Sequence, residues 1–177
     1  MNWIKWSLAG KTLDPPALHS LAVQARWLAR RLERHLLGNH LLANAKALLF
    51  AGLHFAGEEA DGWAATALAI LERELPEQIL ADGGHFELSP MYHALILEDL
   101  IDLTNLARAF PDAVPARHAR LVAAWPETLR RMRRWLLAMA HPDGEIAFFN
   151  DAAIGMAPSP AALEAYAARL GLPAPEP

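Results

Sequence analysis

The sequence contains no cysteine, which excludes a disulfide framework and a thiolate zinc site and leaves the redox compartment undetermined. It contains no apolar run long enough to span a bilayer. Its first residues lack the charged and long apolar segments of a secretory signal. The formal charge of −4 provides no broad basic field for nucleic acid or an anionic membrane. An anionic ligand must therefore be held locally.

The composition is that of a folded domain. The 177 residues fit one domain, and an apolar content of 54% is ample for a sizeable core, which excludes a disordered chain. Eight histidines and six tryptophans are more informative than the net charge.

Helix-start and helix-stop signals divide the first third of the chain. Asp14 precedes two prolines, so a helix should begin there and run to about Leu37. Gly38 should end it, and Asn39 can cap the next helix. Residues 40–55 are so uniformly apolar that they predict an inner helix, buried on most sides.

The same signals predict the later elements. These are a helix at 63–75 that ends before Pro76, a helix from Ser89-Pro90 to about 103, a helix at 116–140 bent or broken at Pro126, an extended piece at 145–149, a helix at 160–170 and a loose tail at 173–177. Short turns and alternating apolar and amphipathic helices predict an all-α fold. We expect residues 1–172 to form an incomplete α/α toroid of antiparallel helical hairpins, with inner and outer helices.

Three polar clusters interrupt these apolar surroundings. They are Gly38, Asn39, His40 and Asn44; Asp82 to Glu87 with Ser89, Tyr92 and His93; and Phe149, Asn150 and Asp151. All lie at expected helix starts or in loops, and stacked hairpins can gather those ends at one side of the assembly. Amides at helix N-termini favour a bound anion, so such a place suits an acidic sugar.

Three ordered motifs carry a resemblance to a known family. They are LGNHLLAN at 37–44, GGHFELSPMYH at 83–93 and HPDGEIAFFND at 141–151. Together they resemble the central motifs of heparinase II/III-like polysaccharide lyases, and the resemblance covers nearly the whole chain.

The resemblance implies a fold and a chemistry. Family members join an N-terminal α/α toroid to a β-sandwich, with the active cleft between them, and the resemblance implies no cofactor. They cleave uronic-acid-containing polysaccharides, such as heparan sulfate, other glycosaminoglycans and alginate, by β-elimination. The resemblance assigns Asn39 and His40 to the uronate carboxylate and Tyr92 to acid catalysis, in some members also to base catalysis. It also implies a periplasmic location.

Other residues are secondary candidates. We expect His85, Glu87, Asn44, Asn150 and Asp151 to bind substrate. Alternatives stay open, since Glu87 could orient Tyr92 or cap the helix beginning at 90, and His85 could contact sugar or simply pack. Asn150 and Asp151 could equally serve a turn.

Some residues have simpler interpretations. Asn39 alone would be a helix cap and Tyr92 alone a buried aromatic, but their occurrence in family order favours an active site. His93 follows Tyr92 and points roughly 100° away from it on a helix, so we expect a structural role. We expect three histidines to be structural or to face solvent: His54, His118 and His141. We expect a solvated helix face from Arg130, Arg131, Arg133 and Arg134. The tryptophans could stack on sugar or fill the core: Trp3, Trp6, Trp27, Trp63, Trp125 and Trp135. No histidine group has metal-ligand spacing, so we expect no metal.

Length separates this chain from the family pattern. A β-sandwich does not fit after Leu172, so we expect the toroid part alone, with doubtful activity in isolation and a tendency to self-associate. One alternative is a glycoside hydrolase that pairs Glu87 with Asp82 or Asp151. Another is a non-catalytic helical module that binds sugar or protein.

Overall fold

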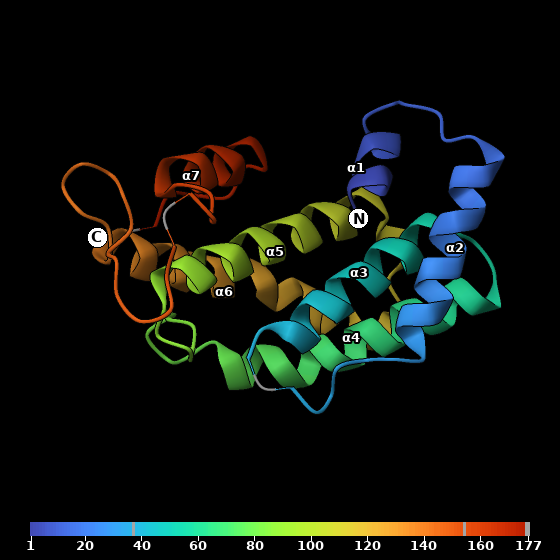
Figure 1. Cartoon of the computed structure of the whole chain (residues 1–177), viewed down its shortest axis with the longest axis horizontal. Helices are drawn as coiled ribbons and strands as arrows, with labels where there is room; N and C mark the ends of the chain where they lie inside the picture. Colours follow the sequence, from blue (N-terminus) through green and yellow to red (C-terminus); the bar gives the residue numbers. More distant parts are fainter. Residues whose placement is uncertain (37, 154, 176–177) are drawn as a thin grey trace.

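The computed structural model describes residues 1–36, 38–153 and 155–175. The regular secondary structure in these ranges is helical (Figure 1). The elements are α1 (Asn2–Leu8), α2 (Pro15–Ala29), α3 (His40–His54), α4 (Glu58–Gln78), α5 (Pro90–Ala109), η1 (Pro111–Ala113), η2 (Ala116–His118), α6 (Ala119–Ala138) and α7 (Pro160–Arg169). Within the described ranges no β-strand forms, and the extended piece expected at 145–149 is reduced to one bridge between Ala140 and Ile146. The all-α prediction is confirmed.

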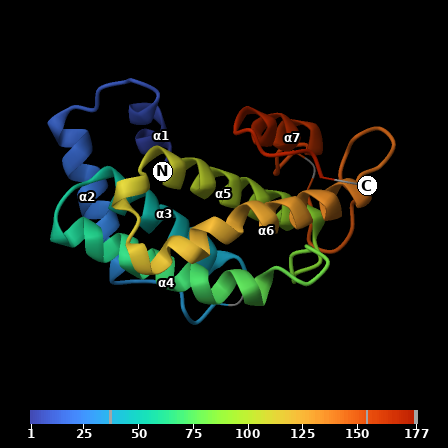
Figure 2. The ribbon, with the colours of Figure 1, turned by 180° about the vertical axis from the view of Figure 1, so that it is seen from behind.

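Helices α3 and α5 form the inner layer. Helix α3 pairs with α4 as an antiparallel hairpin, and α5 pairs with α6 in the same way (Figure 2). Ala45 and Leu48 of α3, and Leu97 and Ile101 of α5, have no exposed surface. A Cβ at Gly52 would lie 2.6 Å from the Ala64 backbone nitrogen, so glycine is what permits the close packing of α3 on α4. Hairpins with inner and outer helices therefore match the expected arrangement.

Side-chain caps fix the starts of three helices. The Asp14 carboxylate accepts from the Ala17 amide at 2.9 Å, and Ser159 Oγ accepts from the Ala162 amide at 3.3 Å. Ser89 caps α5 in the same way. Each of these helices also has proline in its first turn, where the missing N–H has no intrahelical partner to lose. The predicted starts of α2, α5 and α7 are confirmed.

Several predicted helix limits and one predicted break are wrong. Helix α4 begins at Glu58 rather than at 63, and α5 extends to Ala109 rather than to about 103. Helix α2 ends at Ala29 rather than near Leu37, and Leu37 itself lies outside the described residues. Helix α4 passes through Pro76 to Gln78, because a proline in the last turn removes a single hydrogen bond. Of the bend or break predicted at Pro126, the break is wrong: α6 continues through this residue, and the nearby Trp125 and Leu129 are buried and hold it against the core.

Arg133 corrects the expectation of a fully solvated arginine face on α6. Its side chain is only 2% exposed, and its guanidinium forms a bidentate ion pair with Glu164 of α7. It also donates to the Pro173 carbonyl at 2.8 Å, which holds the start of the tail; residues 176 and 177 lie outside the described ranges. Arg133 therefore joins α7 to the outer surface of α6.

A buried charged cluster joins four helices. Lys46 of α3 is 4% exposed, and its ammonium lies 2.5 Å from Asp99 and 2.6 Å from Asp102, both on α5. Asp102 also accepts from Lys5 of α1 at 2.5 Å and from the Tyr166 hydroxyl of α7 at 2.9 Å. Burial alone would lower the pKa of Lys46, but the two aspartates outweigh burial and raise it. The cluster, absent from the sequence expectations, fixes the terminal helices to the core.

The tryptophans divide into two groups. Trp63, Trp125 and Trp135 are buried in the core, whereas Trp3, Trp6 and Trp27 are 49–57% exposed on α1 and α2. Among the described helices, none has the length and apolar character needed to cross a membrane.

Candidate active site

Two glycines fix the loop between α4 and α5 against α6. The loop closes through an antiparallel bridge between Ile79 and His85. A Cβ on Gly83 would lie 2.3 Å from the Arg131 carbonyl oxygen, and a Cβ on Gly84 would lie 2.6 Å from Trp135 Nε1. Gly83 also has a φ of +97°, which side chains rarely adopt. The loop sequence is therefore dictated by close approach to α6, which positions the residues that follow.

His85 and His93 lie beneath this loop with no exposed surface. The His85 amide donates to His93 Nδ1 at 3.2 Å, so His93 carries its hydrogen on Nε2, which donates to the Met132 carbonyl at 2.9 Å. His85 Nε2 donates to Gln78 Oε1 at 3.1 Å. Burial lowers the pKa of each ring to about 4. Both histidines are neutral structural groups at pH 7, as expected for His93, and His85 offers no surface that a bound sugar could contact.

The two neutral rings make stability depend on pH. The folded-state pKa of His85 and His93, about 4, lies below the ordinary 6.5, so their contribution is complete above pH 6.5. As the pH falls from 6.5 towards 4, the unfolded chain takes up protons that the folded chain refuses, and stability should fall by about 3 kcal/mol for each ring. Urea denaturation across this window measures the loss. A free energy of unfolding that stays constant between the two pH values would contradict neutral burial.

Gln78 connects this buried group to the start of α3. It is 2% exposed, and its amide nitrogen donates to the Gly38 carbonyl at 3.1 Å and to Glu74 at 3.0 Å. From the other side, Glu87 Oε1 accepts from the Asn39 amide at 3.0 Å. A Cβ on Gly38, whose φ is +84°, would lie 2.6 Å from the same oxygen. The turn that presents Asn39 is therefore held by two side chains distant in sequence.

Asn39 and His40 occupy the N-terminus of α3. Asn39 stands at the N-cap position, but its side chain makes no capping hydrogen bond, contrary to the simple capping expectation. Glu87 instead accepts from the Asn39 backbone, which leaves the Asn39 amide group uncommitted to the cap. The His40 side chain is 53% exposed, with Nδ1 3.8 Å from Glu33. Both side chains are thus available at one end of the bundle.

Asn44 has a structural partner. It is 8% exposed, and its side chain accepts from the Glu33 amide and donates to the Glu33 carboxylate, both at 2.9 Å. The residue predicted to bind substrate therefore anchors the segment that precedes α3. Its contribution to a ligand would come through that segment.

Tyr92 lies in the first turn of α5, beneath the segment that carries the third polar cluster. Ser89 Oγ accepts from the Tyr92 amide at 3.2 Å and donates to the Asp151 carbonyl at 2.7 Å. The Tyr92 hydroxyl donates to Asp151 Oδ2 at 3.2 Å. Asn150, with a φ of +56°, donates to the Leu88 carbonyl at 2.6 Å. These contacts bring the second and third clusters together.

The carboxylate of Asp151 disfavours ionisation of the Tyr92 hydroxyl. Its hydrogen bond and its charge are the main causes that raise the pKa of Tyr92, and burial and the charge of Glu87 add to them. A protonated tyrosine can donate to a departing oxygen, whereas tyrosinate, the form needed for a base, is disfavoured. Glu87 thus contacts the Asn39 backbone and acts electrostatically on Tyr92.

Asp151→Asn should lower the pKa of Tyr92 towards its ordinary value of 10.0, because the neutral amide can still accept but no longer repels tyrosinate. Tyrosinate ultraviolet absorbance measures the titration, in a Tyr166→Phe background that leaves Tyr92 as the single tyrosine. Asp143→Asn removes the same charge from an exposed turn and should leave the titration unchanged. Equal titrations of all three chains would refute the Asp151 contact.

Two residues that support the site, Gln78 and Glu33, were not predicted from the sequence. Gln78 and Glu33 looked like ordinary polar residues, and only their burial or long-range contacts single them out. Ser89, rather than Glu87, caps α5. Asp82, the hydrolase candidate, accepts from the Gly84 amide at 2.9 Å within its own turn. Across the described residues no group of three or more metal-binding side chains gathers.

This geometry can be compared with known proteins. The family described as heparinase II/III N-terminus matches residues 10–167. The chain belongs to this family. Its helical hairpins are accordingly part of the α/α toroid of heparinase II/III lyases, as the fold expectation stated.

Individual relatives agree with the family. A heparin-sulfate lyase of Pedobacter heparinus is 29% identical over 141 residues, covering 76% of this chain and 19% of the relative. A heparin-sulfate lyase of Bacteroides stercoris is 30% identical, covering 65% of this chain and 17% of the relative. The crystal structure of heparinase III has a TM-score of 0.61 at 29% identity, covering 73% of this chain and 19% of that structure. This heparinase II/III chain therefore spans about a fifth of the length of these lyases.

Proposed function

We propose that this heparinase II/III domain contributes the acid and the carboxylate-binding groups for β-elimination of a uronic-acid-containing polysaccharide. Tyr92 is the acid, and Asn39 and His40 engage the uronate carboxylate. Glu87 and Asp151 position them. Heparan sulfate is the first substrate to consider, because relatives of the chain are named heparin-sulfate lyases.

The observation that carries the proposal is the double connection of Glu87. Its carboxylate accepts from the Asn39 amide at 3.0 Å, and its charge adds to the raised pKa of Tyr92. Residues 48 positions apart in sequence, Asn39 and Glu87, are thereby fixed at the end of the bundle where α5 begins. Three of the resembling motifs meet there, since Asp151 binds Tyr92.

Each residue type suits its step. A base removes the proton from C5 of the uronate, and the electron pair delocalises onto the carboxylate, where Asn39 and His40 can donate hydrogen bonds. Losing one preorganised donor of this kind typically costs about 10²–10³ in rate. The pair then forms the C4–C5 double bond and expels the glycosidic oxygen from C4. Tyr92, whose ionisation Asp151 disfavours, donates its proton to that oxygen.

The test is a panel of heparan sulfate, hyaluronan, glucuronan and alginate mixed with the chain. Elimination should produce one ultraviolet-absorbing unsaturated end for each new reducing end. Reducing ends without that absorbance would overturn elimination in favour of hydrolysis with Glu87 and an aspartate. Binding of a polymer without any new ends would make the domain a non-catalytic binding module.

A further inference from the structure

Positive charge is concentrated in the segment that leads to the candidate active site. Between positions 15 and 57 the sequence holds four arginines and one lysine, but Glu33 is its single acidic residue. Arg30, Arg31 and Arg34 are all exposed on residues 30–36, which we name the arginine linker. The formal charge of the whole chain, −4, conceals this local excess.

The acidic residue of the arginine linker is directed inward. Glu33 bonds through its amide and its carboxylate to Asn44 of α3, at 2.9 Å in each case. The same carboxylate lies 3.8 Å from His40 Nδ1. These contacts fix the linker to the first turns of α3 and direct the carboxylate of Glu33 away from the linker arginines; Glu59 of α4, which pairs with Arg26, also acts electrostatically on Arg30.

The linker arginines have no ion-pair partner within the described ranges. Arg26, one turn earlier on α2, forms a bidentate pair with Glu59 at 2.7 Å. No ion pair of this kind joins a described carboxylate to Arg30, Arg31 or Arg34. Arg31 lies over Trp27 and Arg30 feels the charge of Glu59, but no hydrogen bond commits the three guanidinium groups to a described carboxylate. The planar guanidinium has matching geometry for carboxylates and sulfates.

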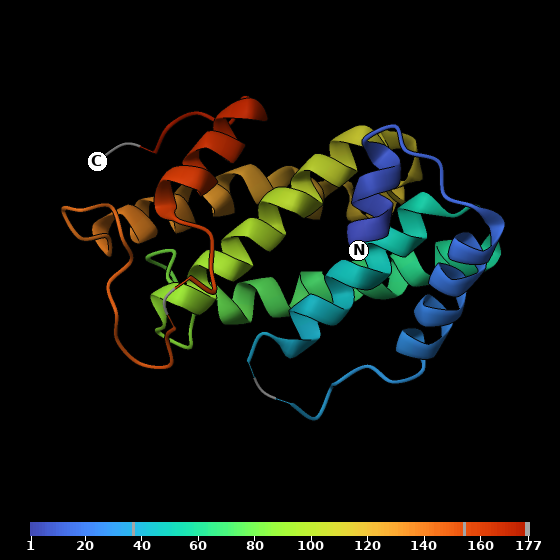
Figure 3. The same ribbon diagram turned by 45° about the horizontal axis from the view of Figure 1, so that its top comes forward.

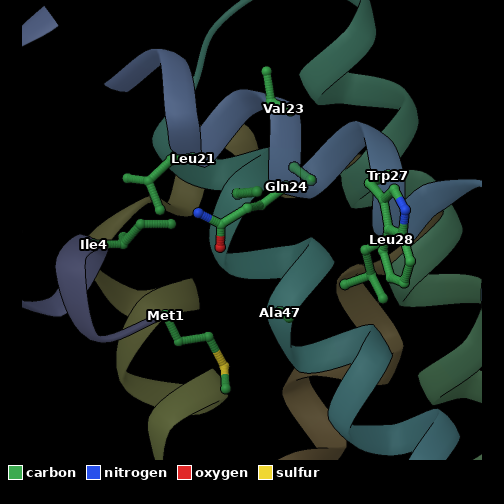
Figure 4. A pocket seen from close by; sticks show the side chains of 10 residues that line it. Met1, Ile4, Leu21, Val23, Gln24, Trp27, Leu28 and Ala47 are labelled. Carbon is green, nitrogen blue, oxygen red and sulfur yellow. The ribbon is translucent and has the colours of Figure 1, made fainter. Parts of the chain in front are cut away.

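Trp27 adds an aromatic surface at the far end of the linker. It is 57% exposed, and the Arg31 guanidinium lies 4.9 Å from the centre of its ring. Figure 4 shows Trp27 beside Leu28 at one end of the apolar pocket between α2 and α3. The apolar face of a sugar ring can pack on the indole while the guanidinium binds an acidic substituent.

The arginine linker forms a path between this tryptophan and the candidate active site. It runs from the end of α2 to the start of α3, where Asn39 and His40 lie (Figure 3). Trp27 lines a pocket together with Ala47, which follows His40 by seven residues, about 10 Å along the helix axis. A polymer that extends from His40 towards Trp27 would run between two points that the linker joins.

We propose that Trp27 and the arginine linker form an extended subsite for an acidic polysaccharide. The subsite binds sugars that lie beyond the reacting unit, on the Asn39–His40 side. This inference rests on the proposed function for the position of the reacting unit. The charge complementarity favours a polyanionic sugar chain over a protein or a neutral glucan.

Two matched double variants test the proposal in the full chain. Arg30→Gln/Arg34→Gln removes two charges from the linker, and Arg120→Gln/Arg134→Gln removes two exposed charges from α6. Calorimetry at several salt concentrations measures the affinity for a disaccharide and an octasaccharide, from heparan sulfate and from alginate. The linker variant should bind the octasaccharide about tenfold more weakly, with a shallower salt dependence and unchanged disaccharide affinity.

The oligosaccharide arms identify the recognised group. A loss with heparan sulfate alone indicates sulfate contacts, and a loss with both polymers indicates carboxylate contacts. Trp27→Ala should also weaken octasaccharide binding, at every salt concentration. Equal losses in the two double variants, or no binding by the parent chain, would overturn the subsite.

Turnover separates this inference from the proposed function. Linker-dependent binding without elimination would leave the subsite standing and show that this chain alone does not perform the proposed elimination. Elimination by a chain whose octasaccharide affinity is unchanged in the linker variant would support the lyase proposal and overturn the subsite.

Discussion

Tyr92→Phe should reduce the formation of unsaturated uronate ends by about 10²–10⁴-fold, the usual contribution of a positioned acid or base. The change removes one oxygen atom, which donates to Asp151 in the free chain. The helix start should be unaffected, because Ser89 caps α5 through the Tyr92 backbone amide. Initial rates of ultraviolet absorbance on the best polymer of the panel measure the effect.

Tyr166→Phe is the matched control, because Tyr166 is the second of two tyrosines in the sequence. Its hydroxyl donates to Asp102 in the buried cluster. This variant should lose some thermal stability and retain its rate. If both variants kept the parent rate, Tyr92 would not be the acid. If both lost it equally, the effect of Tyr92→Phe would be structural.

Lys46→Met should destabilise the chain by about 3 kcal/mol, because it removes the buried ammonium that pairs with the half-buried Asp99 and the buried Asp102. Met is similar in length and apolar, so little packing is lost. Asp102 retains Lys5, but Asp99 loses the ammonium that lies 2.5 Å away. Chemical denaturation at pH 7 measures the change in the free energy of unfolding.

The double variant Lys46→Met/Asp99→Asn separates stranded charge from lost packing. Replacing both partners of a buried pair is often nearly neutral, so most of the stability should return. A double variant as unstable as Lys46→Met would show that the volume or the wider network matters instead. A small loss in Lys46→Met itself would mean that water reaches the cluster.

Local signals predicted the helices that depend on local interactions. Asp14, Ser89 and Ser159 each stand before a proline-led helix, and all three cap it. The uniformly apolar run after His40 forms an inner helix, because it has no polar face to present to water. Local signals were misleading at Pro126, where burial of the flanking residues outweighs the cost of the missing hydrogen bond.

The candidate site was predictable by motif and unpredictable in its contacts. The three sequence motifs contain the residues that come into contact in the structure. Glu87 of the second motif contacts Asn39 of the first, and Asp151 of the third contacts Tyr92 of the second. Gln78 escaped notice because its donation to Gly38 spans 40 residues. The substrate roles assigned to the individual side chains stay predictions, as does the domain boundary at 172.

The buried cluster has a consequence for the order of events on the ribosome. Asp102 follows Lys5 by 97 residues and precedes Tyr166 by 64. At about 5–20 residues per second, α1 waits on the order of 5–20 s before its ionic partner is even synthesised. Throughout that interval α1, with its exposed Trp3 and Trp6, lacks the ion pair that fixes it to α5, which leaves an aromatic segment that a chaperone can hold.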